Sequence, residues 1–145
     1  MFNKILVPTD GSPLSEKAVS TAVEWARSNG AALVVLSVAE PHYAPQLAEG
    51  STVVDANAYN RKMLEIAQAN VAAAAAAARE AGVPCETLVR TSMNPHEEIV
   101  NASKERACDV IVMASHGRKG LRALFVGSET HKVLAYSTVP VLVVR

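Results

Sequence analysis

Four short runs of apolar residues divide the chain and predict strands that are buried on both faces. They cover residues 5–7, 33–36, 110–113 and Val141–Val144. None of them alternates with polar residues, and continuous apolar runs of this length are typical of parallel sheets. Residues 85–90 alternate more, which predicts a fifth strand nearer to an edge of the sheet.

Helix signals fill the intervals between these strands. Ser12 and Pro13 supply a capping hydroxyl and a proline for the first helical position, and Gly30 ends the helix that follows. A second helix is predicted from about Tyr59 to Ala81, where the residues have high helix propensity.

Two more helices are predicted in the second half of the chain. Asn94, Pro95 and Glu97 form a capping pattern, with a cap residue, a proline at the first helical position and a glutamate three residues after the cap. The last helix is predicted to begin near Ser128 and to end before Ser137.

The order of these elements predicts the fold class. Strands alternate with helices throughout, apart from residues 40–57, which show no clear period and predict a long loop that is either mobile or functional. Strict alternation requires right-handed crossover connections. We therefore predict one α/β domain over residues 1–145, with a Rossmann-like open five-stranded parallel sheet and helices on both faces.

Composition restricts the core and the partners. Half of the 145 residues are hydrophobic but only 4% are aromatic, so the core is aliphatic. The 14 basic and 14 acidic side chains cancel, and no basic stretch is dense enough to neutralise many phosphates of a nucleic acid. No nucleic-acid partner is predicted, whereas the zero net charge permits self-association.

The sequence predicts neither export nor insertion into a membrane. The N-terminus enters a strand directly without the layout of a signal peptide, and no apolar run approaches the roughly 20 residues that cross a bilayer. Cys85 and Cys108 are far apart and lack metal-ligand spacing, so we expect neither a disulfide nor a zinc site. A cytoplasmic location follows as the expectation.

Ligands of open parallel sheets bind beyond the carboxyl ends of the strands, and two strand ends carry unusual residues. After the first strand come Pro8, Thr9, Asp10 and Gly11. Gly11 permits a sharp turn, and Asp10 can accept hydrogen bonds from ribose hydroxyls or help to hold a divalent ion. The alternative is that Asp10 and Ser12 only cap the first helix.

The fourth strand is followed by residues 114–128, a loop whose small residues let a ligand approach the backbone. The loop closes with Gly127 and Ser128 at the predicted start of the last helix, where free N–H groups and a partial positive charge suit a phosphate. Ser128 and Thr130 add hydroxyl donors. The cations nearby in the sequence are Arg118, Lys119 and Arg122.

His116, inside this loop, has two interpretations. It either contacts or accepts a phosphoryl group, or it is a hydrogen-bonded loop residue. Its sequence neighbours supply no base and orienting group of the kind that a catalytic pair needs, so no catalytic residue is predicted. The lysine and serine of a Walker loop and the Gly-x-Gly-x-x-Gly fingerprint are also absent from the sequence.

Together these residues resemble the nucleotide-binding branch of the universal stress protein family. The resemblance extends from residues 5–12 to residues 139–144. That branch carries a glycine, two residues, a second glycine, nine residues, and then a glycine with serine or threonine. Gly117, Gly127 and Ser128 match the second glycine and the final pair.

Ala114 stands where the pattern has its first glycine. An alanine there costs nothing if the backbone keeps the ordinary extended conformation of a strand end. It costs about 1 kcal/mol or more if φ must be positive. The substitution also adds one methyl group near the ligand.

The resemblance implies a fold like that of the adenine nucleotide alpha hydrolases and a bound adenine nucleotide. The implied ligand is ATP, or else AMP or ADP, with Mg²⁺ or Mn²⁺ on the phosphates. Asp10 is implied to hold the ribose and Val38 to flank the adenine. The implied nucleotide contacts are Pro8, Thr9, Asp10, Val38, Met113, Ala114, Ser115, His116, Gly117, Arg118, Gly127, Ser128, Glu129 and Thr130. The last strand, Val141–Val144, is implied to pair with its copy in a homodimer.

The sequence leaves three functions open. The first is a nucleotide-responsive stress regulator that binds ATP or a related adenine nucleotide and acts through a homodimer. The second is a slow ATPase or phosphoryl-transfer enzyme, for which the loop supplies cations but no evident base. The third is a dimeric interaction module that no longer binds nucleotide, and Ala114 is its only support.

Overall fold

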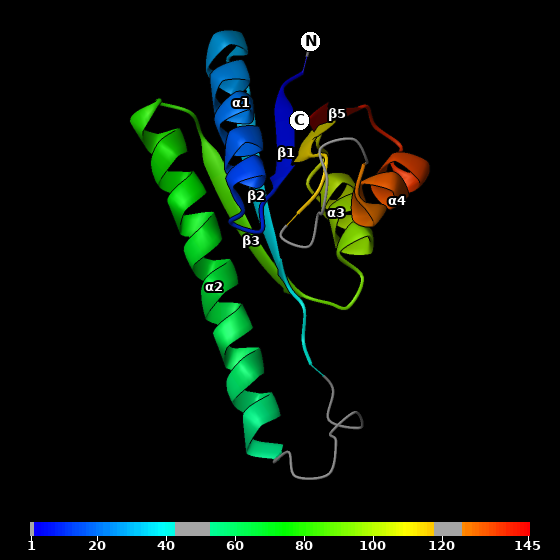
Figure 1. The fold of residues 1–145 in the computed structure, drawn as a ribbon. Helices are drawn as coiled ribbons and strands as arrows, with labels where there is room; N and C mark the ends of the chain where they lie inside the picture. The colour runs from blue at the N-terminus through cyan, green and yellow to red at the C-terminus, as the bar shows by residue number, and fades with distance from the viewer. Residues whose placement is uncertain (1, 43–52, 118–125) are drawn as a thin grey trace.

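In the described part of the chain, five parallel strands form one sheet in the order β3-β2-β1-β4-β5. The computed structural model describes residues 2–42, 53–117 and 126–145 (Figure 1). The strands are β1 (Lys4–Pro8), β2 (Ala32–Ala39), β3 (Cys85–Thr91), β4 (Val110–Ala114) and β5 (Val141–Val144). The prediction of a five-stranded parallel sheet with a weaker strand at one edge is confirmed.

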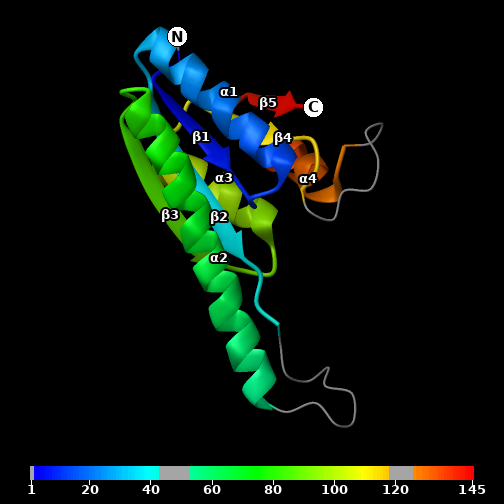
Figure 2. The same cartoon turned by 60° about the vertical axis from the view of Figure 1, so that its left-hand side comes forward.

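Within the described residues, four helices cover the two faces of the sheet. They are α1 (Pro13–Asn29), α2 (Val53–Glu80), α3 (Pro95–Glu105) and α4 (Ser128–Tyr136). The helices α1 and α2 lie on one face, and α3 and α4 lie on the other (Figure 2). Among the described residues, no helix is both long and apolar enough to cross a membrane.

Successive residues of each central strand point to opposite faces, which gives the molecule two aliphatic cores. In β1, Ile5 and Val7 pack toward α1 and α2, while Leu6 packs toward α3 and α4. Strands β2 and β4 follow the same alternation. All three β1 side chains are fully buried, and this two-sided burial explains why the strands read as continuous apolar runs.

The order of the strands reverses at β1, which pairs with β2 on one side and with β4 on the other. The chain leaves β1 into α1 on one face and leaves β4 toward α4 on the opposite face. The segments that follow β1 and β4 therefore diverge, and a crevice forms between them at the carboxyl ends of the strands.

The ends of α1 agree with the sequence signals. The Ser12 hydroxyl accepts the Ser15 N–H at 3.3 Å, and Pro13 occupies the first turn. Gly30 follows the helix with φ of 66°, a left-handed conformation that glycine adopts without the cost of a side chain.

The start of α2 corrects the prediction. The helix begins at Val53 rather than near Tyr59, so the end of the expected loop, including Asn57, is helical. No proline or glycine lies between Val53 and Tyr59, and the β-branched and asparagine residues there lower helix propensity by only tenths of a kcal/mol each. The rest of the expected loop, residues 43–52, lies outside the described residues.

The start of α3 also differs from the prediction. Asn94 is the cap residue and Pro95 follows it, but the Asn94 side chain makes no capping hydrogen bond. A carboxylate from another helix takes that role, because Glu129 of α4 accepts the His96 N–H at 2.9 Å. The cap is a tertiary contact, which a local pattern cannot reveal.

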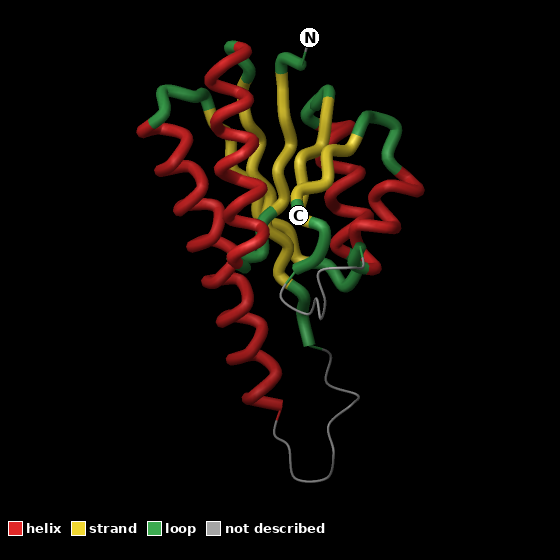
Figure 3. Tube along the Cα trace, turned by 45° about the horizontal axis from the view of Figure 1, so that its top comes forward, coloured by secondary structure: helices red, strands yellow, loops and turns green. Residues whose placement is uncertain are grey.

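The long helix α2 packs on β2 and β3 and continues past the carboxyl ends of the strands (Figure 3). At about 1.5 Å per residue, its 28 residues span about 42 Å. The outer half of α2 therefore stands beside the crevice and can form one of its walls.

Candidate functional site

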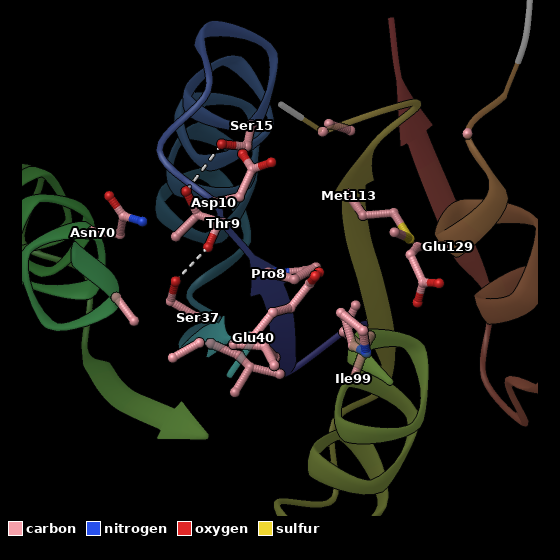
Figure 4. Close-up of a pocket in the computed structure, with 18 of the residues that line it drawn as sticks. Pro8, Thr9, Asp10, Ser15, Ser37, Glu40, Asn70, Ile99, Met113 and Glu129 are labelled. Carbon is pink, nitrogen blue, oxygen red and sulfur yellow. Dashed lines mark hydrogen bonds between the residues drawn. The ribbon is translucent and has the colours of Figure 1, made fainter. Parts of the chain in front are cut away.

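A pocket of about 620 Å³ opens at the carboxyl ends of β1, β2 and β4 (Figure 4). Its lining also includes residues from α2, from the start of α3 and from the start of α4. This volume lies within the usual range for sites that hold a small molecule or cofactor. The position is the crevice that the reversal of strand order creates.

The turn after β1 is held by hydrogen bonds to β2 and α1. Thr9 donates its N–H to Leu36 O at 2.8 Å and accepts the Ser37 hydroxyl on its own carbonyl at 2.7 Å. Its hydroxyl lies 3.1 Å from the Ser15 hydroxyl and accepts the Gly11 N–H at 3.2 Å. These contacts use the polar groups of Thr9 within the protein and fix the turn that carries Asp10.

Asp10 has both a structural contact and a place in the pocket lining. Its Oδ1 accepts the Ser12 N–H at 2.9 Å, so Asp10 supports the start of α1. Its Oδ2 faces Gly117 so closely that a Cβ on Gly117 would collide with it. The two interpretations of Asp10 are therefore compatible, because one oxygen supports the turn while the carboxylate borders the pocket.

Ala114 keeps the conformation of a strand residue. It ends β4 in register with Val144, and among the described residues other than glycine only Ala107 has a positive φ. Its methyl group belongs to the core on the side of α1 and α2. Ala114 therefore replaces the first glycine of the pattern without backbone strain.

The segment after β4 is closed by a hydrogen bond at its base. Ser115 donates its N–H to Val144 O at 2.8 Å, and its carbonyl accepts the Gly127 N–H at 2.6 Å. A Cβ on Gly127 would lie 3.3 Å from Ser115 O and from His116 Cα, which is tighter than ordinary contact. A side chain at position 127 would require its neighbours to shift by a few tenths of an ångström, so glycine favours this close approach, whereas its φ of −63° suits any residue.

The N-terminus of α4 faces the pocket. His131 donates the first helical hydrogen bond, to Gly127 O at 3.0 Å, so the N–H groups of residues 128–130 have no acceptor within the helix. Such groups carry a partial positive charge and suit an anion. Thr130 is only 2% exposed, and its hydroxyl donates to Ala114 O at 3.0 Å. In this arrangement its backbone N–H, and not its hydroxyl, is available to donate to a ligand.

Glu129 joins the starts of α3 and α4. Its Oε2 accepts the His96 N–H and lies 2.9 Å from His96 Nδ1, while Oε1 accepts from Lys132 at 3.2 Å. Partial burial alone would raise the pKa of Glu129. The hydrogen bonds from His96 and Lys132, with the Lys132 charge, outweigh that effect and lower the pKa below the ordinary 4.5.

The sequence profile of the universal stress protein family matches residues 1–145. The chain belongs to the universal stress protein family. It is 36% identical to the universal stress protein YxiE of Bacillus subtilis, and the match covers 100% of both chains.

Two solved structures resemble this universal stress protein in fold as well as in sequence. MJ0577 of Methanocaldococcus jannaschii superposes with a TM-score of 0.81 at 28% identity, over 99% of this chain and 96% of that one. A universal stress protein solved in complex with cAMP has a TM-score of 0.72 at 26% identity, over 99% and 97%.

The pocket of this universal stress protein brings together nearly all of the contacts that the sequence suggested. Of the contacts that lie within the described residues, its lining includes every one except Ser115. Ser115 is buried behind the pocket, where its backbone joins β4 to β5 and to Gly127. Arg118, like Lys119 and Arg122, lies outside the described residues. His116 lines the pocket and its Nδ1 lies 3.2 Å from the Ser115 hydroxyl.

The sequence did not reveal the wall that α2 contributes. The residues of α2 that line the pocket are Tyr59, Met63, Ile66, Ala67 and Asn70. Hydrophobic periodicity indicates which face of a helix is buried, but not which part of it passes the ends of the strands. Asn70 is the residue that could have indicated a ligand-facing part of α2, because its amide interrupts the apolar stripe of the helix.

In the part of the chain that the structure describes, neither a metal site nor a reactive cysteine pair is found. Within residues 2–42, 53–117 and 126–145, no three His, Cys, Asp or Glu side chains gather as metal ligands. Burial raises the pKa of the Cys108 thiol to about 11, which keeps it protonated and unreactive at neutral pH.

The Glu129→Gln variant tests the joint between α3 and α4. Because the pKa of Glu129 is lowered on folding, its ionised form stabilises the folded chain above about pH 4.5, and this contribution is lost as the pH falls through the folded pKa. We expect the free energy of unfolding to fall by about 1 kcal/mol at neutral pH, since the carboxylate is partly exposed. Urea unfolding across this pH range measures it.

The matched control is Glu97→Gln, in the first turn of α3 but exposed, which should change the stability little at any pH. The loss in the free energy of unfolding caused by Glu129→Gln should become smaller in acid. A loss that is the same at every pH, or no loss at all, would contradict a stabilising role for the ionised Glu129 carboxylate.

Proposed function

We propose that this universal stress protein binds an adenine nucleotide in the pocket and acts as a nucleotide-responsive stress regulator. The observation that carries the proposal is the start of α4. Three N–H groups without helical acceptors lie at the start of this helix, and its first residues line a pocket large enough for a nucleotide. The cAMP complex of a relative that is 26% identical supports a nucleotide ligand.

The lining suggests how the nucleotide lies. Val38 and Met113 offer apolar surface for the adenine, and Asp10 offers acceptors for the ribose. The α4 N-terminus receives the phosphates, with Ser128 exposed at its first position. Pro8 and Thr9 form the rigid edge between the base and the sugar.

A divalent ion fits this arrangement only through the nucleotide. The described residues hold no cluster of metal-ligating side chains, so Mg²⁺ or Mn²⁺ would be held by phosphate oxygens, with the Asp10 carboxylate in the pocket lining as a further oxygen ligand. The ion would screen the charge of the phosphates, and ATP would depend on it more than AMP.

Isothermal titration of ATP with Mg²⁺, and of AMP, into nucleotide-free protein tests the proposal. The Gly117→Ala variant should weaken binding about tenfold, because the added methyl group displaces the Asp10 carboxylate. The φ of Gly117 is not positive, so the substitution changes the pocket without straining the backbone.

Gly30→Ala is the matched control for that titration. Gly30 has a positive φ but open space around it, and it is not among the residues that line the pocket. The variant should lose about 1 kcal/mol of stability and keep its nucleotide affinity. If the wild-type protein binds neither ATP nor AMP, the proposed function is wrong.

We also propose that the regulator is a homodimer that pairs through β5. This strand is an edge of the sheet, with β4 as its one described neighbour. Leu142 lies on the same face as Val144 but is 41% exposed, so an apolar side chain of the edge is left uncovered. Unpaired strand edges with exposed apolar residues favour pairing with another chain.

Light scattering coupled to size exclusion tests the dimer. The wild-type protein should elute as a dimer, and Leu142→Arg should shift it toward the monomer by placing a charge in the interface. Leu134→Arg is the control, since Leu134 is equally exposed on α4 but not on the strand edge. A wild-type monomer, or a dimer that only the control disrupts, would contradict pairing through β5.

A further inference from the structure

Asn70 lies where α2 passes the turn between β1 and α1. Figure 4 shows its amide turned from α2 toward the turn that carries Thr9 and Asp10. Its Oδ1 lies so close to Gly11 that a Cβ on Gly11 would collide with it. The amide thus occupies space that any other residue at position 11 would fill, and Asn70 lines the pocket beside Asp10.

The surroundings of Asn70 on α2 are apolar. One turn before it, Ile66 and Ala67 line the pocket, and one turn after it Ala74 is buried in the core. Within the described part of the chain, no hydrogen bond is formed by the Asn70 side chain. A polar group in an apolar stripe lowers stability unless it finds partners, so a stripe built only for packing would not favour an amide here.

The chemistry of an amide beside a carboxylate suits one kind of ligand group. Adjacent hydroxyls on a sugar ring each donate one hydrogen bond and accept others. A carboxylate only accepts, so Asp10 can receive hydroxyl protons but cannot donate in return. The Asn70 amide supplies the missing donor, Nδ2, without adding a second negative charge near the phosphates.

We propose that Asn70 is a specificity residue that recognises the ribose 2′,3′-diol together with Asp10. The inference rests on the proposed nucleotide function and deepens it. Asn70 Nδ2 donates to one hydroxyl of the diol, while the Asp10 carboxylate accepts from the other. Ribonucleotides are therefore preferred over nucleotides that lack these hydroxyls, and α2 takes part in ligand recognition rather than only in packing.

Titration of two ligands into two variants tests the role of Asn70. The ligands are ATP and 2′,3′-dideoxyATP, each with Mg²⁺, and the variants are Asn70→Ala and Asn70→Asp. Loss of one neutral hydrogen bond should weaken ATP binding about 3- to 10-fold in Asn70→Ala. Asn70→Asp should show at least that loss, because aspartate cannot donate. In Asn70→Ala the affinity for dideoxyATP should match the wild type, so the preference for ATP falls by the same factor.

Gln68→Ala is the matched control. Gln68 carries the same amide on the same helix but is exposed, so its loss should change neither affinity. Equal weakening of both ligands by Asn70→Ala would overturn the inference, since the amide would then contact the base or the phosphates. Unchanged affinities would overturn it as well. In either case the proposed function would stand, whereas a wild-type protein that binds neither ligand would overturn both.

Discussion

The parallel pairing of β1 with β4 is the constraint on which the pocket depends. Each strand is followed by a helix on a different face of the sheet, so the two connecting segments must separate where the strands end. The resulting crevice receives the Asp10 turn from one side and the start of α4 from the other. Two aliphatic cores hold β1 and β4 in place from both faces. The geometry of the site is therefore set by the buried side chains of the two cores, most of which do not line the pocket.

The contacts of Glu129 fix the side of the pocket that the start of α4 forms. The Glu129 carboxylate lies between the starts of α3 and α4 and is bound by His96 from the opposite helix. Both helix starts carry a partial positive charge, so one carboxylate stabilises the two of them together. The Thr130 hydroxyl and the Gly127 N–H tie the same region to the end of β4. The polar side chains at the start of α4 thus serve mainly to hold its backbone N–H groups in position.

Local sequence signals predicted the fold and the two segments of the site that follow β1 and β4. They did not predict the tertiary contacts that hold those segments in place. Buried strands, the Ser12 cap and the glycine that precedes α4 could be predicted because their signals lie within a few residues of sequence. The role of Glu129 could not be, since its partner His96 is 33 residues away along the chain. The α2 wall was also missed, because helical periodicity does not say where a helix meets a strand end. Ala114 needed the structure as well, since only φ shows that the backbone at this position does not require a glycine.

Backbone amide chemical shifts in nuclear magnetic resonance test the central claim most directly. AMP and adenosine share the base and the ribose and differ by one phosphate. If the start of α4 binds that phosphate, AMP should shift the amides of Ser128, Glu129 and Thr130, and adenosine should not. Both ligands should shift the amides of Thr9 and Val38, on the base and ribose side. Shifts at α4 that are the same with both ligands, or absent with AMP, would contradict this account.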